Sequence, residues 1–324
     1  MKQHNGSIWT TIVATVAIVV FSLSSVFGRP AKKLRVVTSL PDLASIAQEV
    51  GGSHVETFSI AKGYQDPHFV DPKPSYMIKL QKADLFVQVG LDLEIGWVPP
   101  LLDGARNPNI LPGGKGYVDA SKGVPLLEIP VGDPTKLRAQ GDIHVYGNPH
   151  YWLDPLRGKI IADNIYDGLV RLRPEFQADF ERNLKQFKQK IDQKTAEWIK
   201  RLTPYEGTKI VAYHNSWPYF DERFGFDIVT FVEPKPGIPP TPKQLVSVIK
   251  TMLQNDVRVI IISPYYSKKS SELIASKTHA QIVELAGSVG GEPGIKTYFD
   301  LFDYDINKLI ETFQKAGIQP HATE

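Results

Sequence analysis

The chain has 324 residues, of which 42% are hydrophobic and 22% charged, a balance typical of folded globular proteins and not of disordered ones. Its length exceeds that of one ordinary hydrophobic core and favours two lobes. A net charge of +2 gives no sign of nucleic-acid binding, and the lack of cysteine excludes disulfides, thiolate metal sites, thiol nucleophiles and lipidated cysteines. Any transition-metal site must therefore use oxygen donors and the imidazoles of eight histidines.

The first 28 residues have the features of an export signal. A weakly basic start precedes an uncharged, mainly apolar run over 8–23, and small residues then suit cleavage after Gly28. An uncleaved anchor is the alternative, because the apolar run approaches the ~20 residues that a spanning helix needs. Either interpretation places the rest of the chain outside the cytoplasm. With no cysteine to carry a lipid, we expect a free periplasmic protein.

From residue 34 onward the pattern alternates between strand and helix, which predicts a parallel sheet with helices on both faces. Predicted strands cover 34–39, 55–60 and 83–90, and predicted helices cover 42–50 and 75–81. The stretch 104–148 is rich in glycine and proline, so we expect mostly loop there with one or two short strands.

A long helix is predicted over 174–202, where apolar residues recur at helical spacing without glycine or internal proline. At ~1.5 Å per residue it would span roughly 40 Å, which suits a stiff strut between lobes. The alternation then resumes, with predicted strands at 208–214, 227–233, 257–263 and 281–286 and predicted helices at 217–224, 242–255, 270–278 and 297–317. We therefore expect a signal (1–28), an N-terminal lobe (33–173), a linking helix (174–202) and a C-terminal lobe (203–320).

Three histidines fall in loops beyond the carboxyl ends of predicted strands, where open α/β sheets bind their ligands. His68 follows the strand 55–60, His150 follows the glycine- and proline-rich stretch, and His214 ends the strand 208–214. In the sequences DPH and NPH a proline directly precedes the histidine and stiffens the loop that carries the imidazole. A shared metal-binding cluster is one interpretation, and solvated loop residues are the other.

The remaining donors are less clearly marked. Glu233 ends its predicted strand and is the candidate fourth ligand, with a structural role in its loop or a completing water as alternatives. Asp71 and Asp154 are candidate acceptors for the ring N–H groups, because metal-bound imidazoles are usually held in this way. His54 and His144 are interpreted as structural, although His144 could capture metal at the periphery.

The combination of an export signal, the motifs QDPHFVDPKPS, GNPHYWLDP, AYHNSWPYF and EPKPGIPPTPKQL, and one long helix resembles the zinc/manganese solute-binding proteins of metal ABC importers. The resemblance covers nearly the whole mature chain. It implies two α/β lobes joined by a rigid helix, with one metal ion in the interlobe cleft held by His68, His150 and His214. It also implies a monomer without enzymatic activity that delivers its ion to an ABC permease and ATPase at the inner membrane.

Imidazole at the third position, where related manganese binders often have glutamate, favours Zn²⁺ over Mn²⁺. Two features depart from the family. Many members carry an aspartate ligand after the last strand, where this chain has Ala286 and Gly287, and many zinc members have a histidine-rich loop, where this chain has only His144. The alternatives left open are a manganese or iron carrier, a periplasmic zinc-dependent hydrolase, a siderophore- or cobalamin-type binding protein and a metal-independent adhesin.

Overall fold

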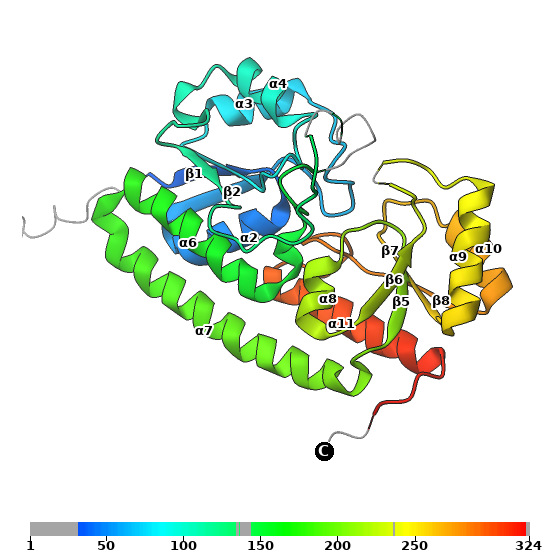
Figure 1. Ribbon diagram of the computed structural model, residues 1–324. Coiled ribbons are helices and arrows are strands. Elements are labelled where there is room, and N and C mark those ends of the chain that lie inside the picture. The colour runs from blue at the N-terminus through cyan, green and yellow to red at the C-terminus, as the bar shows by residue number, and fades with distance from the viewer. Residues whose placement is uncertain (1–31, 134–135, 137–143, 236, 322–324) are drawn as a thin grey trace, which may run out of the picture. The chain divides into compact units, whose positions relative to one another are not determined.

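Two four-stranded sheets, parallel throughout, form the frame of the protein (Figure 1). The computed structural model describes residues 32–133, 136, 144–235 and 237–321. The predicted export signal lies outside these residues. Within the described part of the chain, no helix is both long and apolar enough to cross a membrane.

The first sheet has the strand order β2-β1-β3-β4 and defines the first lobe. Its strands are β1 (Leu34–Thr38), β2 (Val55–Ser59), β3 (Leu85–Gln88) and β4 (Tyr117–Asp119). Its helices are α2 (Pro41–Gly51), α3 (Pro74–Gln81), α4 (Val98–Ala105) and α6 (Pro155–Leu172). The helices α2 and α6 cover one face and α3 and α4 the other (Figure 1), which explains why most residues of the central strands β1 and β3 are apolar and buried.

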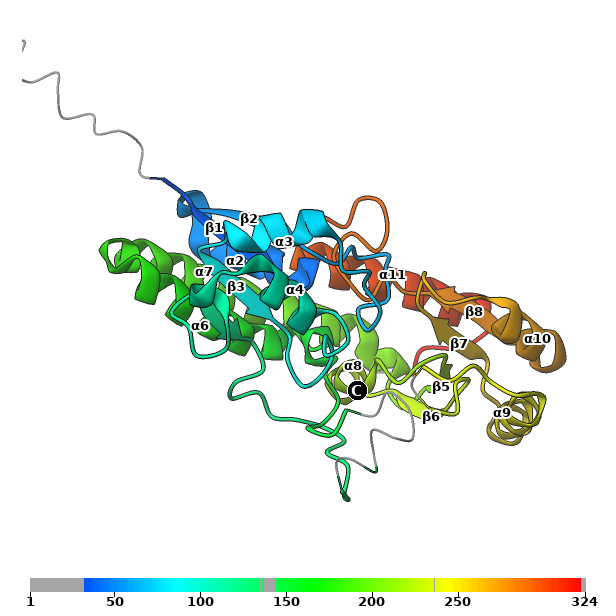
Figure 2. The same cartoon turned by 90° about the horizontal axis from the view of Figure 1, so that it is seen from above.

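The second sheet repeats this plan with the order β6-β5-β7-β8 and defines the second lobe. Its strands are β5 (Lys209–Ala212), β6 (Asp227–Phe231), β7 (Val259–Ile262) and β8 (Gln281–Glu284), and its helices are α8 (Pro218–Phe224), α9 (Pro242–Asn255), α10 (Lys269–Thr278) and α11 (Tyr298–Lys315). Alternate strand residues enter two cores: Ile210 joins the large core with α8 and α11, and Val211 joins a smaller one with α9 and α10. The two helix pairs accordingly lie on opposite faces (Figure 1 and Figure 2).

The predicted long helix is present as α7 (Gln177–Leu202), which follows one 3-10 turn at Pro174–Phe176. Its buried residues form a single stripe: Phe180, Leu184, Phe187, Ile191, Thr195, Trp198 and Leu202. Near its start Asn183 donates to the Val50 carbonyl of α2, and near its end Trp198 lies against Phe302 of α11. The helix therefore spans both lobes, and the predicted α/β fold with two lobes and a long linking helix is confirmed.

Further contacts tie the two lobes together beside α7. Asp154, at the start of α6, is fully buried and pairs with Arg157 on its own helix and with Arg223 of α8. On the other side, Asp42 of α2 accepts hydrogen bonds from the Ser288 hydroxyl and the Val289 amide in the loop after β8. These buried contacts fix the carboxyl ends of the two sheets relative to each other.

Candidate metal centre

Three of the predicted histidines meet between the carboxyl ends of the two sheets. One ring nitrogen from each of His68, His150 and His214 lies within 4.8 Å of the other two. Their ring centroids are 5.1 to 5.4 Å apart, and all three side chains are buried. The first two come from the first lobe and the third from the second, so the cluster forms only when both lobes are in place.

Each of the three histidines lies in a loop whose position is set by a neighbouring strand or turn. His68 follows β2 on a loop that Trp97 holds by donating from its indole nitrogen to the Pro67 carbonyl at 2.9 Å. His150 lies directly before a 3-10 turn at Tyr151–Leu153, which leads into α6. His214 lies two residues beyond the end of β5.

The DPH and NPH sequences form the same hydrogen-bond pattern around two of these rings. The Nδ1 of His68 lies 2.7 Å from Asp66 Oδ1, and the backbone N–H of His68 donates to that same oxygen at 3.0 Å. Asn148 Oδ1 accepts in the same way from the backbone and the Nδ1 of His150, at 3.0 and 2.9 Å. An acceptor two residues before the histidine, with a rigid proline between them, therefore fixes both the ring and its loop.

The ring of His214 is held by a residue that follows the neighbouring strand of the same sheet. Ala212 of β5 pairs with Phe231 of β6, and two residues further along each strand lie His214 and Glu233. The Nδ1 of His214 accordingly lies 2.7 Å from Glu233 Oε2. The parallel register thus places the carboxylate behind the imidazole.

These three anchors assign the tautomers. Each Nδ1 faces an oxygen acceptor and so carries the ring proton, which leaves a lone pair on each Nε2. The Nε2 atoms of His150 and His214 are buried and have no hydrogen-bond partner among the described residues. A buried unsatisfied acceptor costs about 1–3 kcal/mol, and a single cation satisfies several converging lone pairs at once. The donor set therefore fits a transition-metal ion.

Burial keeps His150 in the neutral form that binds metal, and contacts with His68 keep Asp66 ionised. Burial first, and then the nearby His68, His214 and His144, lower the pKa of His150 well below its ordinary value. Burial alone would raise the pKa of Asp66, but hydrogen bonds from the side chain and backbone of His68 hold that pKa below its usual value. A neutral imidazole backed by an ionised carboxylate is a strong electron-pair donor.

Three other predicted site residues have different surroundings from those expected. The carboxylate of Glu233, the expected fourth ligand, is not part of the group of nitrogens within 4.8 Å and instead accepts from His214. Asp71 is exposed, and Asp154 accepts from two arginines and caps α6 through the Leu156 amide. In the described residues neither aspartate is hydrogen-bonded to a histidine ring, because Asp66 and Asn148 occupy those places.

His144, interpreted as structural from the sequence, lies beside the cluster and contacts it through His68. Its Nε2 lies 3.2 Å from the Nε2 of His68, and its ring centroid is 6.2 Å from that of His150. Burial, followed by the charges of His68 and His214, lowers the pKa of His144 to about 3. The only sequence signal for His144 is that it precedes His150 by six residues in HVYGNPH. His54 instead stacks on Phe176 and bonds to Asp179, as a structural residue does.

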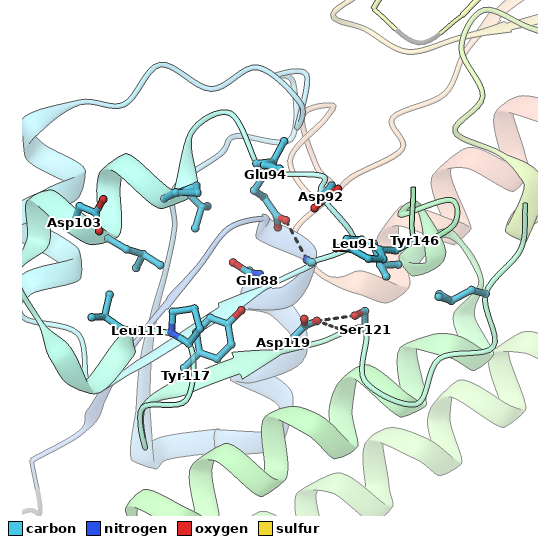
Figure 3. A pocket seen from close by; sticks show the side chains of 17 residues that line it. Gln88, Leu91, Asp92, Glu94, Asp103, Leu111, Tyr117, Asp119, Ser121 and Tyr146 are labelled. Atoms are coloured by element: carbon cyan, nitrogen blue, oxygen red, sulfur yellow. Dashed lines mark hydrogen bonds between the residues drawn. The ribbon is translucent and has the colours of Figure 1, made fainter. Parts of the chain in front are cut away.

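Two cavities lie near the strand ends. One of about 220 Å³ lies beside the cluster between the lobes and is lined by Asp66, His68, Phe69, Tyr213, His214, Glu233, Gly237, Pro239 and Tyr266. A second, of about 710 Å³, lies at the ends of β3 and β4 within the first lobe and contains none of the clustered histidines (Figure 3). Its buried Glu94 accepts from the Val89 and Gly90 amides, and burial raises the pKa of that carboxyl to about 7. The histidine cluster, and not the larger cavity, is therefore the candidate metal centre.

The loop after β8 has backbone groups where many family members have a ligand. The Ala286 and Gly287 amides donate to Asp305 of α11, at 2.7 and 3.2 Å. Burial raises the pKa of Asp305 to about 7. This carboxylate supports the loop from behind and so takes a structural role.

Comparison with known proteins agrees with this geometry. The family model described as "Zinc-uptake complex component A periplasmic" matches residues 36–312. The chain belongs to this family of metal-importer solute-binding proteins. The resemblance first carried by the histidine loops is thereby confirmed.

The relatives span several metals. The manganese ABC transporter substrate-binding lipoprotein PsaA of Streptococcus anginosus is 24% identical over 319 residues, covering 96% of this chain and 99% of its own. The iron-binding protein YfeA of Yersinia pestis is 27% identical over 292 residues, covering 88% of this chain and 87% of its own. A crystal structure of ZnuA, 24% identical, superposes with a TM-score of 0.74 over 87% of this chain and 99% of that one. The choice of ion for this chain therefore depends on its own donor atoms.

Proposed function

We propose that this protein is the extracytoplasmic solute-binding component of an ABC importer, and that it captures Zn²⁺ and delivers it to a membrane permease and its ATPase. The observation that carries the proposal is that one ring nitrogen from each of His68, His150 and His214 lies within 4.8 Å of the other two in a buried site, while each Nδ1 is engaged by an oxygen. Family membership supplies the transport context.

The donor atoms favour zinc over manganese. Imidazole nitrogens suit Zn²⁺, whereas carboxylate and water oxygens suit Mn²⁺. Among the described residues, the group of converging atoms contains three nitrogens and no carboxylate oxygen. The nearest carboxylates, from Asp66 and Glu233, are engaged on the Nδ1 side of the rings.

Capture and release follow from the anchoring of the site. The ring nitrogens face inward before any ion arrives, because each Nδ1 is held by an oxygen from its own lobe. Little reorganisation is then needed on binding, which favours high affinity. The spanning helix α7 and the buried contacts of Asp154 resist lobe opening. Release accordingly needs work from the transporter to separate His214 from the two first-lobe histidines.

Native mass spectrometry with metal competition tests this function. The wild-type protein, stripped of metal and offered equal Zn²⁺, Mn²⁺ and Fe²⁺, is expected to take up one Zn²⁺ per chain. His68→Ala, His150→Ala and His214→Ala should each lose stoichiometric zinc. His279→Asn is the matched control, because this exposed histidine lies in the left-handed conformation at the end of α10, which asparagine also adopts. Full zinc affinity in all three alanine variants, or preferential uptake of manganese or iron, would contradict the proposal.

A further inference from the structure

The three histidines leave open which side chain supplies a fourth donor, and this inference rests on the proposed zinc-binding function. We propose that His144 supplies the fourth nitrogen, so that four imidazoles hold the ion, and that Glu233 acts on the ion only through His214. His144 lies on the loop that also carries His150, six residues earlier in the chain.

The first argument is the distance between two ring nitrogens. The Nε2 atoms of His68 and His144 lie 3.2 Å apart. In a tetrahedral zinc site with bonds of about 2.0–2.1 Å, neighbouring donor nitrogens are about 3.3–3.4 Å apart. This pair therefore already has the spacing of two ligands on one ion.

The second argument is that His144 is oriented like the other three rings. A hydrogen bond to the backbone of Leu91 favours the charged form of His144, which identifies the Leu91 carbonyl as the acceptor. With Nε2 turned to His68, Nδ1 is the nitrogen that this carbonyl engages. All four rings then have an oxygen on Nδ1. His144 directs its Nε2 to that of His68, although it is not one of the three residues whose ring nitrogens lie within 4.8 Å of one another.

The third argument is that the first lobe builds an anchor for this ring. Leu91 and Asp92 adopt left-handed backbone conformations, with φ of 55° and 65°, which non-glycine residues rarely do. Buried Glu94 holds the start of this turn through the Val89 and Gly90 amides, and Leu91 and Tyr146 line the same cavity (Figure 3). The strained turn thus presents a carbonyl to the histidine loop.

The fourth argument concerns the loop itself. The chain turns after His144, whose carbonyl accepts from the Gly147 amide at 3.2 Å. Gly147 has φ of 116°, which glycine tolerates and other residues rarely adopt, and the Asn148 amide then donates to the Leu127 carbonyl. The turn returns the chain to the cluster, so that His144 and His150 reach it from one loop.

Glu233 lies on the other side of its histidine ring, against Nδ1, whereas His144 approaches the Nε2 of His68. Its Oε2 lies 2.7 Å from the Nδ1 of His214, on the side of the ring remote from the converging Nε2 atoms. A carboxylate in this place orients the imidazole and strengthens its donation without touching the ion. A nitrogen-only site of this kind selects zinc over manganese more strongly than three imidazoles and one carboxylate would.

The test combines X-ray absorption at the zinc edge with metal competition. The wild-type zinc complex should show four imidazole nitrogens and no carboxylate oxygen, and His144→Ala should show three and a light-atom replacement. His144→Ala should lower zinc affinity by more than the roughly 10–100-fold typical of a lost outer partner. It should also reduce the preference for Zn²⁺ over Mn²⁺, whereas the control His279→Asn leaves both unchanged.

The outcomes separate this inference from the proposed function. If the wild-type protein binds no zinc, the proposed function fails and the fourth ligand fails with it. If the wild-type complex shows three imidazoles and one carboxylate, and His144→Ala keeps wild-type affinity, only the present inference is overturned. The wild-type spectrum decides the matter even if the variant folds poorly.

Discussion

The Nδ1 of His214 lies 2.7 Å from Glu233 Oε2, and both side chains are buried at the carboxyl ends of neighbouring strands. The parallel pairing of β5 and β6 sets this contact. It gives the second lobe a role in the site beyond one donor atom, because the carboxylate fixes the tautomer and the direction of the ring.

Removing this carboxylate tests its role. Glu233→Ala should lower zinc affinity roughly 10–100-fold while keeping one site per chain, as expected for an outer partner of a ligand histidine. Glu233→Gln should lose less, because the amide oxygen still accepts from Nδ1. Competition against a zinc chelator measures both. Glu284→Ala is the matched control, since this glutamate ends β8 and pairs with Lys268 away from the cluster. A loss as severe as that of His214→Ala would make Glu233 a direct ligand.

The buried Asp154 is expected to matter for stability and not for metal binding. Asp154→Ala leaves Arg157 and Arg223 without their shared partner and removes the cap of α6. Breaking a buried ion pair in this way costs about 3–5 kcal/mol of unfolding free energy. Urea denaturation of the metal-free protein measures the loss, and exposed Asp71→Ala should stay within about 0.5 kcal/mol of wild type. Equal stability of the two variants would contradict the role assigned to Asp154.

Gly63 is expected to be intolerant of any side chain. A Cβ atom there would lie 2.1 Å from the Val289 carbonyl oxygen and 2.4 Å from the Gly291 amide nitrogen, in the loop after β8. Gly63→Ala should therefore cost about 1–3 kcal/mol by overpacking this contact between lobes. It should also weaken zinc binding, because Gly63 lies in the loop after β2 that carries His68. Gly96→Ala is the control, since nothing lies within 4 Å of its Cβ position. Thermal unfolding with and without zinc compares them, and matching behaviour of the two variants would refute the prediction.

The buried Asp305 predicts a dependence of stability on pH. Burial raises its pKa from 3.8 to about 7, so the folded state holds a proton that the unfolded state has lost. The unfolding free energy should therefore decline as pH rises from about 4 to about 7, by an amount on the order of 4 kcal/mol for this group alone. Asp42, whose pKa burial raises to about 6, acts in the same direction.

Asp305→Asn removes this titration while keeping an oxygen for the Ala286 amide. Denaturation of the metal-free variant across this pH window should show a flatter profile than the wild-type protein. A slope equal to that of the wild type would contradict the assignment. Chelator must be present throughout, because metal binding itself depends on pH.

The sequence predicts most of the fold because the apolar strands and turn residues alternate clearly. The helix predicted at 242–255 occurs as α9 with those bounds, and the Thr241 hydroxyl caps it by accepting from the Gln244 amide. The helix α6 is not among the predicted elements, because Gly158 and Gly168 interrupt its helical pattern. Both glycines are needed for close packing, against Tyr298 and Val118 respectively, which only the folded structure reveals.

The candidate site was predictable in its histidines and less so in what surrounds them. The prolines before His68 and His150 mark both loops in the sequence, but the ring acceptors are Asp66 and Asn148, which precede the histidines, and not the predicted aspartates, which follow them. The repeated acidic or amide residue two positions before histidine was the available signal. The closeness of His144 to His68 depends on the turn after His144 and on a separate loop of the first lobe, and no local pattern encodes this contact.

A crystal structure of the zinc-loaded protein tests the central claim most directly. One zinc ion is expected where the Nε2 atoms of His68, His150 and His214 converge, with Nδ1 of each ring still on Asp66, Asn148 and Glu233. Zinc bound elsewhere on the chain, or at this place through Nδ1 with those three contacts broken, would contradict the account.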